Sequence, residues 1–439
     1  MRILLISPTA LDFKGNPVKQ SRVHLPGLTL PMLAAVTPPE VEVKLILETT
    51  QDIPFDQHWD AVGLTGMGSG IVRAWQIADK FRDRKVTVII GGIAASLADP
   101  ELILQHCDSI VTGEAEELWP AVIKDLQGGN LKRIYKMEKR PSIYDLPVPR
   151  YDLMKDLRIG FWRPVQATRG CPFTCNFCSV ASFSNRSYRK RPISQVIRDV
   201  RAAKKSGAKH IAFIDDNICV DLDYCNDLFE ALINEKIIWM SQSSLHLTEY
   251  PKLMRLAFKS GCRLLSIGIE SINKSSLEQI DKSWNRPDRY AAAFKALRDN
   301  GIDVSTEMII GLDGDDESIF ERSYRFIVEN KISIPRVHII TPIPGTRLFE
   351  EMLLENRITT RDFSRYSGGK VNFLPKNIRP EILQAGYWQL YRQLFSWHSI
   401  LKRIFVNEAK LGPYMQAVIW AVNLKYKYHI HHKICPGIV

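Results

Sequence analysis

Three cysteines close together are the strongest chemical signal in this sequence. They stand in the run Arg169-Gly-Cys171-Pro-Phe-Thr-Cys175-Asn-Phe-Cys178, with three and then two residues between them. Three thiolates at this spacing can hold one iron–sulfur cluster from a single loop, and a [4Fe–4S] cluster would keep one iron open to a small molecule. Zinc is the competing interpretation, but structural zinc sites are closed sets of four ligands, and no fourth Cys or His lies nearby.

The elements around this loop should form an open barrel. We expect strands at Arg163–Thr168, His210–Asp215, Ile238–Ser243, Leu264–Ile269, Val304–Gly311 and Val337–Pro342. Helices fit between them at Ile193–Ser206, Tyr224–Asn234, Pro251–Ser260, Asp288–Asn300 and Ser318–Glu329, and Gly207, Gly261 and Gly301 stand where three of these should end. Residues 161–345 therefore predict a partial (β/α)6 TIM-type barrel with its site at the carboxyl ends of the strands.

A second α/β region precedes the barrel. Residues 1–130 predict strands at Arg2–Ser7, Val41–Leu47, Ala61–Gly66, Val86–Gly92 and Ser109–Gly113, with helices at Ile71–Arg84, Pro100–His106 and Glu114–Leu126. This alternation is typical of a Rossmann-like parallel sheet, which binds ligands beyond the carboxyl ends of its strands. Those ends carry Thr65, Gly66, Met67, Gly91, Gly92, Gly113 and Glu114, and the glycines would let a large planar ligand approach the backbone.

The remaining segments are a linker and a helical C-terminal region. Residues 131–160 contain a proline-rich turn and predict the linker, and residues 346–439 predict a helical extension with Tyr387–Phe405 as its clearest amphipathic stretch. The basic, aromatic segment Tyr426–Lys433 is expected to be a frayed tail on the surface. The alternative is that its histidines, His429, His431 and His432, bind a metal.

The cysteine spacing, with an aromatic residue before the last cysteine, resembles the radical S-adenosylmethionine superfamily. The resemblance implies that the open iron chelates S-adenosylmethionine and that an electron from the cluster cleaves it to a deoxyadenosyl radical. It places Phe177 against the adenine, and it assigns contacts with S-adenosylmethionine to residues after the later strands. These are Asp215, Asp216, Asn217, Gln242, Ser244, Glu270, Gly311 and Pro342. A helix cap or turn is the alternative role for each.

The two α/β regions together resemble the cobalamin-binding subclass, which includes anaerobic magnesium-protoporphyrin ester cyclase and the hopanoid and bacteriochlorophyllide methyltransferases. The markers are Leu30–Pro38, Gly91-Gly92, Gly113–Glu116 and Leu146–Leu153. They imply a corrin between the two domains. The D-x-H-x-x-G loop that ligates cobalt in many cobalamin proteins is absent from residues 1–130, as in this subclass generally, which implies binding without a lower imidazole. The alternative is a domain that has kept its fold and lost the cofactor.

These features predict a cobalamin-dependent C-methyltransferase acting on a bulky apolar metabolite, such as a tetrapyrrole or polycyclic lipid. A cobalamin-dependent cyclase or oxidoreductase without methyl transfer is the first alternative, and an RNA-modifying radical enzyme is the second. The chemistry requires a low-potential electron donor, for which we expect a flavodoxin or a ferredoxin, and it requires the exclusion of oxygen.

Composition sets limits on location and partners. The formal net charge is +11, but the basic residues are spread along the chain, which favours a solvated face over a nucleic-acid site. The N-terminus lacks the apolar stretch of a signal peptide, and no apolar run reaches the roughly 18 residues of a membrane span. The other five cysteines, Cys107, Cys219, Cys225, Cys262 and Cys435, are expected to be ordinary thiols. We therefore expect a cytoplasmic protein, with peripheral membrane contact through the C-terminal region.

Overall fold

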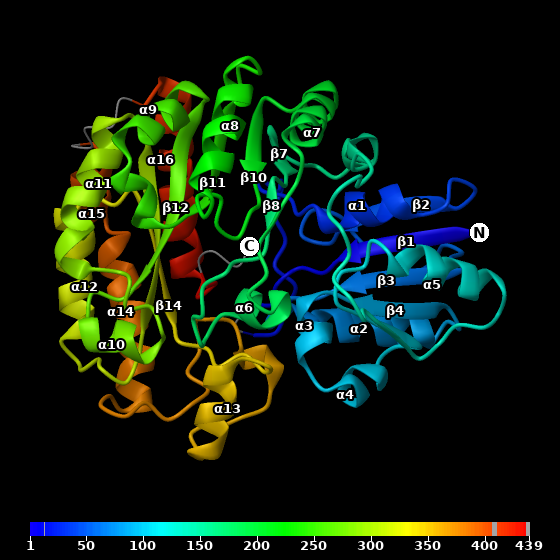
Figure 1. Cartoon of the computed structure of the whole chain (residues 1–439). Coiled ribbons are helices and arrows are strands. Elements are labelled where there is room, and N and C mark those ends of the chain that lie inside the picture. The colour runs from blue at the N-terminus through cyan, green and yellow to red at the C-terminus, as the bar shows by residue number, and fades with distance from the viewer. Residues whose placement is uncertain (13, 406–410, 436–439) are drawn as a thin grey trace. The chain divides into compact units, whose positions relative to one another are not determined.

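The computed structural model describes residues 1–12, 14–405 and 411–435 (Figure 1). The chain divides into two compact units, one formed by residues 1–165 and 194–211, the other by residues 166–193 and the chain from residue 212 onward. Two six-stranded sheets organise it, and the predicted α/β fold class is confirmed.

The first sheet has the strand order β2-β1-β3-β4-β5-β6, and all neighbouring strands are parallel. Its central strands are continuous apolar runs, because helices cover both faces of such a sheet. Helices α1 and α5 pack together, and α2, α3 and α4 pack against β3, β4 and β5. The strands are β1 (Arg2–Ser7), β2 (Glu42–Leu47), β3 (Ala61–Thr65), β4 (Thr87–Gly91), β5 (Ser109–Thr112) and β6 (Ile134–Lys136). The helices are α1 (Thr29–Val36), α2 (Gly70–Arg82), α3 (Ile93–Leu97), α4 (Pro100–Leu104) and α5 (Leu118–Gln127), followed by the 3-10 turn η1 (Tyr151–Met154).

The second sheet has the strand order β14-β13-β12-β11-β10-β7, so each strand neighbours the next along the chain. The pairs among β11, β12, β13 and β14 are parallel. The strands are β7 (Trp162–Val165), β10 (His210–Phe213), β11 (Ile238–Ser243), β12 (Cys262–Glu270), β13 (Asp303–Ile310) and β14 (Ile334–Ile339), and β8 (Thr168–Arg169) pairs separately with β9 (Arg189–Lys190). The helices between them are α6 (Ser179–Ser184), α7 (Ile193–Lys205), α8 (Leu222–Ile233), α9 (Pro251–Lys259), α10 (Lys274–Gln279), α11 (Tyr290–Asp299) and α12 (Ile319–Glu329), with 3-10 turns η2 (Leu245–Glu249) and η3 (Pro287–Arg289).

One face of this second sheet keeps accessible surface. Along β11, Ile238, Met240 and Gln242 are accessible while the residues between them are buried, and β14 alternates in the same way, with Arg336 and His338 accessible. Successive side chains of a strand point to opposite faces, so the buried set faces the helices and the accessible set faces the inside of the open barrel. Figure 1 shows α8, α9, α11 and α12 flanking the strands. The sheet thus presents an inner face on which polar side chains can meet a ligand.

The C-terminal region differs in two ways from the sequence-based expectation. The stretch Tyr387–Phe405 is broken into two helices, because Ser396 accepts a hydrogen bond from the Ser399 amide and begins a new helix there. The segment Tyr426–Lys433 is not a frayed tail: as far as His431 it belongs to a 19-residue helix. That helix buries a stripe of side chains three or four residues apart, namely Met415, Ile419, Asn423, Tyr426, His429 and Ile430. The elements of this region are α13 (Arg347–Leu354), η4 (Phe363–Arg365), α14 (Pro380–Leu394), α15 (Trp397–Ile404) and α16 (Pro413–His431).

The structure can also be compared with the predicted helix ends and with the elements that the sequence did not predict. Gly207, Gly261 and Gly301 adopt φ values of +95°, +105° and +77°, which confirms them as the left-handed residues that end helices. The short elements α1, α3 and β6 were not predicted, and β6 lies inside the stretch expected to be a linker. Within the described residues, no helix is both long enough and apolar enough to cross a bilayer.

Candidate functional site

The three cysteines of the predicted cluster loop lie together between β8 and α6. Cys178 is the residue from which α6 begins, and its amide donates to the Cys175 carbonyl oxygen at 3.3 Å. Burial raises the pKa of Cys171 and of Cys175 to about 11 and also raises that of Cys178. A negative charge on one thiol would further raise the pKa of its neighbours, so the three sulfur atoms share one electrostatic environment.

The three thiols suit an iron–sulfur cluster. Among the residues that the structure describes, no three His, Cys, Asp or Glu side chains converge as the ligands of one metal ion do. A cluster does not require convergence, because each of three irons takes one thiolate. The buried thiols are protonated at neutral pH, so an incoming cluster must displace their protons. Lys282 lowers the pKa of all three thiols and so favours the thiolate form.

Two of the acidic residues assigned to S-adenosylmethionine also support this loop. The carboxylate of Asp215 accepts hydrogen bonds from the amides of Ala167 and Thr168 and, at 2.6 Å, from the Thr168 hydroxyl. Burial raises the pKa of Asp215 to about 7. Asp216 accepts from the Gly170 amide at 2.9 Å. The loop that precedes Cys171 is thus tied to the end of β10.

The next two strand ends bring polar residues to the same edge of the sheet. Asn217 follows β10, and its side-chain oxygen accepts from the Ser244 amide at 3.2 Å just beyond the end of β11. The Ser244 hydroxyl is buried and has no hydrogen-bond partner among the described residues. Gln242 is exposed on the inner face of β11. These side chains retain hydrogen-bonding capacity for a bound ligand.

Glu270 ends β12 in a strained conformation, with φ at +60°, where the pairing of β12 with β13 shifts register. Its carboxylate lies 2.7 Å from the Lys282 ammonium, and each side chain is only 9% accessible. Lys282 also lies over the ring of Trp284, which stacks on Phe173 of the cysteine loop at 4.4 Å between ring centroids. Sequence analysis missed Lys282, because it follows α10 in an ordinary polar stretch that no spacing singles out.

The remaining residues assigned to S-adenosylmethionine lie at comparable positions. Phe177 is partly accessible in the cysteine loop. Gly311 directly follows β13 and has φ at +86°. Its amide donates a hydrogen bond to the Asp315 carboxylate at 3.0 Å, and a Cβ at this position would strike the Leu383 side chain. Pro342 is buried three positions beyond β14. All the assigned residues therefore belong to the cysteine loop or to the carboxyl ends of the strands.

The residues assigned to cobalamin gather in the loops after β3, β4 and β5 of the first unit. Gly92 has φ at +97°, and a Cβ there would lie 2.7 Å from the Thr65 hydroxyl oxygen. Gly113 also has φ at +97°, and its amide donates to Ser96 Oγ at 2.9 Å. Met67 is 74% exposed, whereas Glu114 is buried beside Arg140 at 3.5 Å. The loops thus interlock and present an apolar side chain at their surface. Gly66 belongs to the first of these loops, and its amide donates at 3.3 Å to the carbonyl oxygen of Gly91, the last residue of β4.

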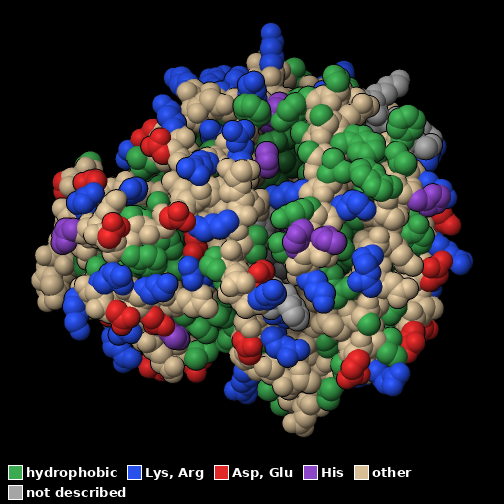
Figure 2. Space-filling model, turned by 180° about the vertical axis from the view of Figure 1, so that it is seen from behind, with side chains coloured by type: hydrophobic (Ala, Val, Ile, Leu, Met, Phe, Trp, Pro, Cys, Tyr) green, Lys and Arg blue, Asp and Glu red, His purple; other side chains and the backbone are tan. Residues whose placement is uncertain are grey.

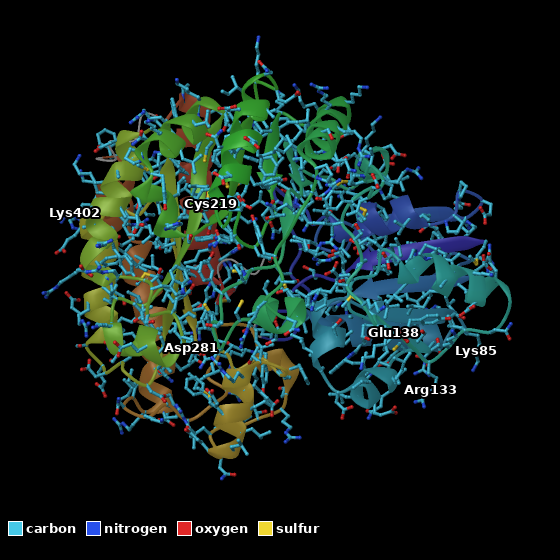
Figure 3. All side chains as sticks on the ribbon, in the orientation of Figure 1. Lys85, Arg133, Glu138, Cys219, Asp281 and Lys402 are labelled. Carbon is cyan, nitrogen blue, oxygen red and sulfur yellow. The ribbon has the colours of Figure 1, made fainter. Side chains whose placement is uncertain are left out.

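The other cysteines lie apart from the cluster loop in sequence. Cys107, Cys219, Cys225 and Cys262 are buried free thiols, and Cys435 is partly accessible. Cys219 is labelled in Figure 3, and the Cys225 thiol donates to the Ile218 carbonyl oxygen at 3.0 Å. On the face drawn in Figure 2, Lys and Arg side chains are scattered among neutral and acidic ones.

Comparison with known proteins identifies relatives along nearly the whole chain. Residues 165–327 match the family model described as the radical SAM superfamily. The bacteriochlorophyllide d C-12(1)-methyltransferase of Chlorobaculum tepidum is 31% identical over 410 residues, which cover 91% of this chain and 89% of that protein. The C-8(2)-methyltransferase of the same organism is 26% identical over 431 residues, covering 94% and 95%.

Solved structures show the same fold. The radical S-adenosylmethionine methyltransferase TsrM from Kitasatospora setae, solved with tryptophan and a S-adenosylmethionine analogue, matches with a TM-score of 0.66 at 12% identity, covering 98% of this chain and 97% of that one. A second structure of TsrM, with cobalamin and a [4Fe–4S] cluster bound, matches with a TM-score of 0.64 at 13% identity, covering 100% and 91%. The overlap extends over both sheets and the C-terminal helices.

Proposed function

This chain belongs to the radical SAM superfamily, and from that membership we propose that it is a cobalamin-dependent radical C-methyltransferase acting on a tetrapyrrole. The observation that carries the proposal is the likeness to a bacteriochlorophyllide methyltransferase over nine-tenths of the chain, with the three-cysteine loop inside it. When bound, the cluster and S-adenosylmethionine supply a carbon radical, and cobalamin supplies a transferable methyl group. A polycyclic lipid is the alternative substrate class.

The residues of this chain would bind and orient these groups. We propose that Cys171, Cys175 and Cys178 hold the cluster, and that Asp216, Asn217 and the free Ser244 hydroxyl receive the polar end of S-adenosylmethionine. Asp215 would position the cysteine loop through its three hydrogen bonds. Lys282 would hold Glu270 at the end of β12, so that Glu270 meets the ribose in a fixed orientation.

Cobalamin is proposed to bind at the loops after β3, β4 and β5. The exposed Met67 side chain and the glycines Gly66, Gly92 and Gly113 suit the flat, largely apolar face of a corrin. TsrM, which shares this fold, was solved with cobalamin bound, and this supports a corrin as a cofactor of this chain. Glu114 is better explained as the partner of Arg140, so we propose no corrin contact for it.

The setting of the enzyme is part of the proposal. We propose the domain boundaries 1–130, 131–160, 161–345 and 346–439, with the linker adding strand β6 to the first sheet. We also propose a cytoplasmic location without oxygen, and a flavodoxin or ferredoxin as electron donor. Helix α15 and the residue that follows it expose Trp397, Leu401 and Phe405 at four-residue intervals, with 55%, 46% and 81% of their surface accessible. Lys427 lies over the Trp397 ring at 5.4 Å. An apolar stripe with adjacent basic residues suits peripheral contact with an anionic membrane.

The proposal is tested by following a labelled methyl group. The anaerobically reconstituted protein is incubated with reductant, bacteriochlorophyllide d and methyl-labelled S-adenosylmethionine. Label is expected in the tetrapyrrole for the natural protein and for Cys107→Ala, which removes a thiol elsewhere, but not for Cys178→Ala. An altered but unlabelled tetrapyrrole would favour the cyclase or oxidoreductase alternative. Failure to change any tetrapyrrole with a full complement of cluster and corrin would contradict the proposal.

A further inference from the structure

A charged cluster lies on the inner face of the second sheet, apart from the residues assigned to S-adenosylmethionine. Glu307 on β13 stands opposite Arg336 on β14, and His338 is two residues further along β14. Arg336 forms an ion pair with Glu307, and the His338 Nε2 atom lies 3.2 Å from the other carboxylate oxygen. Ser266 on β12 donates to Glu307 at 3.3 Å and accepts from Arg336 at 2.7 Å. Three adjacent strands thus build one polar site.

In this cluster the carboxylate oxygens already accept hydrogen bonds, whereas one donor has no partner among the described residues. Both Glu307 oxygens are engaged, by Arg336 and Ser266 on one side and by His338 on the other. The Arg336 Nε atom is buried and finds no hydrogen-bond partner within the part of the chain that the structure describes. A buried donor without a partner is unfavourable, so a ligand that offers an acceptor would be bound favourably.

The charge of the cluster points to the same kind of ligand. Burial alone would lower the pKa of His338, but its hydrogen bonds to Cys435 and Glu307 raise that pKa to about 9. With Arg336, two cations then face one carboxylate, and the cluster carries a net positive charge at neutral pH. An isolated charge of this kind inside a protein is costly unless it is paired. An anionic group would complete the site.

Part of the surface of this cluster remains accessible. The side chains of Glu307, Arg336 and His338 keep 25%, 23% and 27% of their surface accessible. Burial is nevertheless the largest single influence on the pKa of each of these three groups. Tyr387 on α14 and Cys435, just beyond α16, lie beside it, with 3.0 Å between the tyrosine oxygen and the sulfur. The site is thus a polar spot with aromatic side chains next to it.

We propose that Glu307, Arg336 and His338 form a subsite that binds the carboxylate of an otherwise apolar substrate. Arg336 donates a hydrogen bond to that carboxylate through its buried Nε atom, His338 contributes its positive charge, and Glu307 holds both cations in place. The inference rests on the proposed function and narrows it, because tetrapyrroles carry carboxylate side chains and polycyclic hydrocarbon lipids do not.

The test compares a carboxylic acid with its neutral ester, without turnover. Binding of bacteriochlorophyllide d and of its methyl ester is measured by absorbance and fluorescence titration on the reconstituted protein under anaerobic conditions. The natural protein should bind the acid at least about tenfold more tightly than the ester. Arg336→Gln and His338→Gln should each reduce that preference by weakening binding of the acid more than binding of the ester. Arg325→Gln, which removes an exposed arginine from α12, is the matched control and should keep the full preference.

Two further observations keep the test decisive. Because Arg336→Gln leaves Glu307 buried without its partner, the double variant Glu307→Gln/Arg336→Gln removes both charges, and cluster absorbance and thermal unfolding report whether each variant is folded. Equal binding of acid and ester by the natural protein, or binding of neither, overturns the subsite. Acid-selective binding without labelled methyl transfer would count against the methyltransferase proposal alone.

Discussion

Replacing Gly170 by alanine should cost the protein its iron–sulfur cluster as well as some stability. Gly170 precedes Cys171 with φ at +84°, and an added Cβ would strike the carbonyl oxygen of Ser187 and lie 3.1 Å from Ser184 Cβ. The Ser187 amide is bonded to the Ser184 carbonyl oxygen at 3.0 Å, at the end of the helix that begins at Cys178. Relief of the overlap must therefore move Cys171 relative to Cys178.

The size of the effect follows from two contributions. A non-glycine residue in the left-handed region costs about 1–2 kcal/mol, and overlap with packed neighbours adds about 1–3 kcal/mol. Gly207 supplies a matched control, because its φ is +95° but a Cβ there would meet nothing within 4 Å. Gly207→Ala should carry only the first cost. Metal–ligand distances tolerate a shift of only about 0.2 Å, so the movement forced at Gly170 should also impair cluster binding.

The assay is iron and sulfide content per chain after anaerobic reconstitution, together with the unfolding midpoint in urea. Gly207→Ala should bind a full cluster with slightly reduced stability, and Gly170→Ala should bind much less iron at the same protein concentration. A Gly170→Ala protein that binds as much iron and sulfide as the natural one would refute the reasoning.

Three other predictions concern buried groups. Burial lowers the pKa of His429 to about 4, so as the pH falls the imidazole is protonated in the unfolded chain before it is protonated in the folded one. The free energy of unfolding should therefore fall as the pH drops from about 6.5 to about 4, by up to about 1.4 kcal/mol per pH unit. His429→Gln should flatten this slope in urea titrations, and an unchanged slope would contradict the assignment. Lys282→Met should destabilise the protein by about 3–5 kcal/mol by stranding Glu270, and Glu270→Gln in the same chain should restore much of that loss in denaturant titrations; no recovery would count against the pair. Tyr391→Phe removes hydrogen bonds to the amide and carbonyl of Val337, at 2.9 and 2.8 Å, and should cost about 1–2 kcal/mol and speed hydrogen exchange at that amide; unchanged exchange would argue against this contact.

Much of the architecture could be predicted, because its signals are local. The strand at Ile238–Ser243 is predicted with the bounds that the structure shows, since it is a short run with an apolar first half that follows a helix and a turn. The helix-ending glycines were recognisable because only glycine adopts a positive φ at little cost. The cysteine spacing could likewise be read directly, and its likeness to the radical SAM superfamily is borne out by the family match.

The parts that escaped prediction depend on contacts between distant segments. The Glu270–Lys282 pair joins the end of β12 to the segment after α10, and the Glu307–Arg336 pair arises from the register of β13 with β14. Neither contact is encoded by spacing along the chain. The end of α16 was mistaken for a tail because its lysines and histidines hide a buried stripe that needs tertiary partners to be stable.

The central claim is that one chain carries both an iron–sulfur cluster and a corrin. It is tested most directly by reconstituting the protein anaerobically with iron, sulfide and hydroxocobalamin, removing unbound material, and measuring iron, sulfide and corrin per chain. We expect one cluster and one corrin per chain, with the cluster lost and the corrin kept in Cys178→Ala. A protein that binds no cluster under these conditions would contradict the account, and one that binds a cluster without corrin would contradict its cobalamin-dependent form.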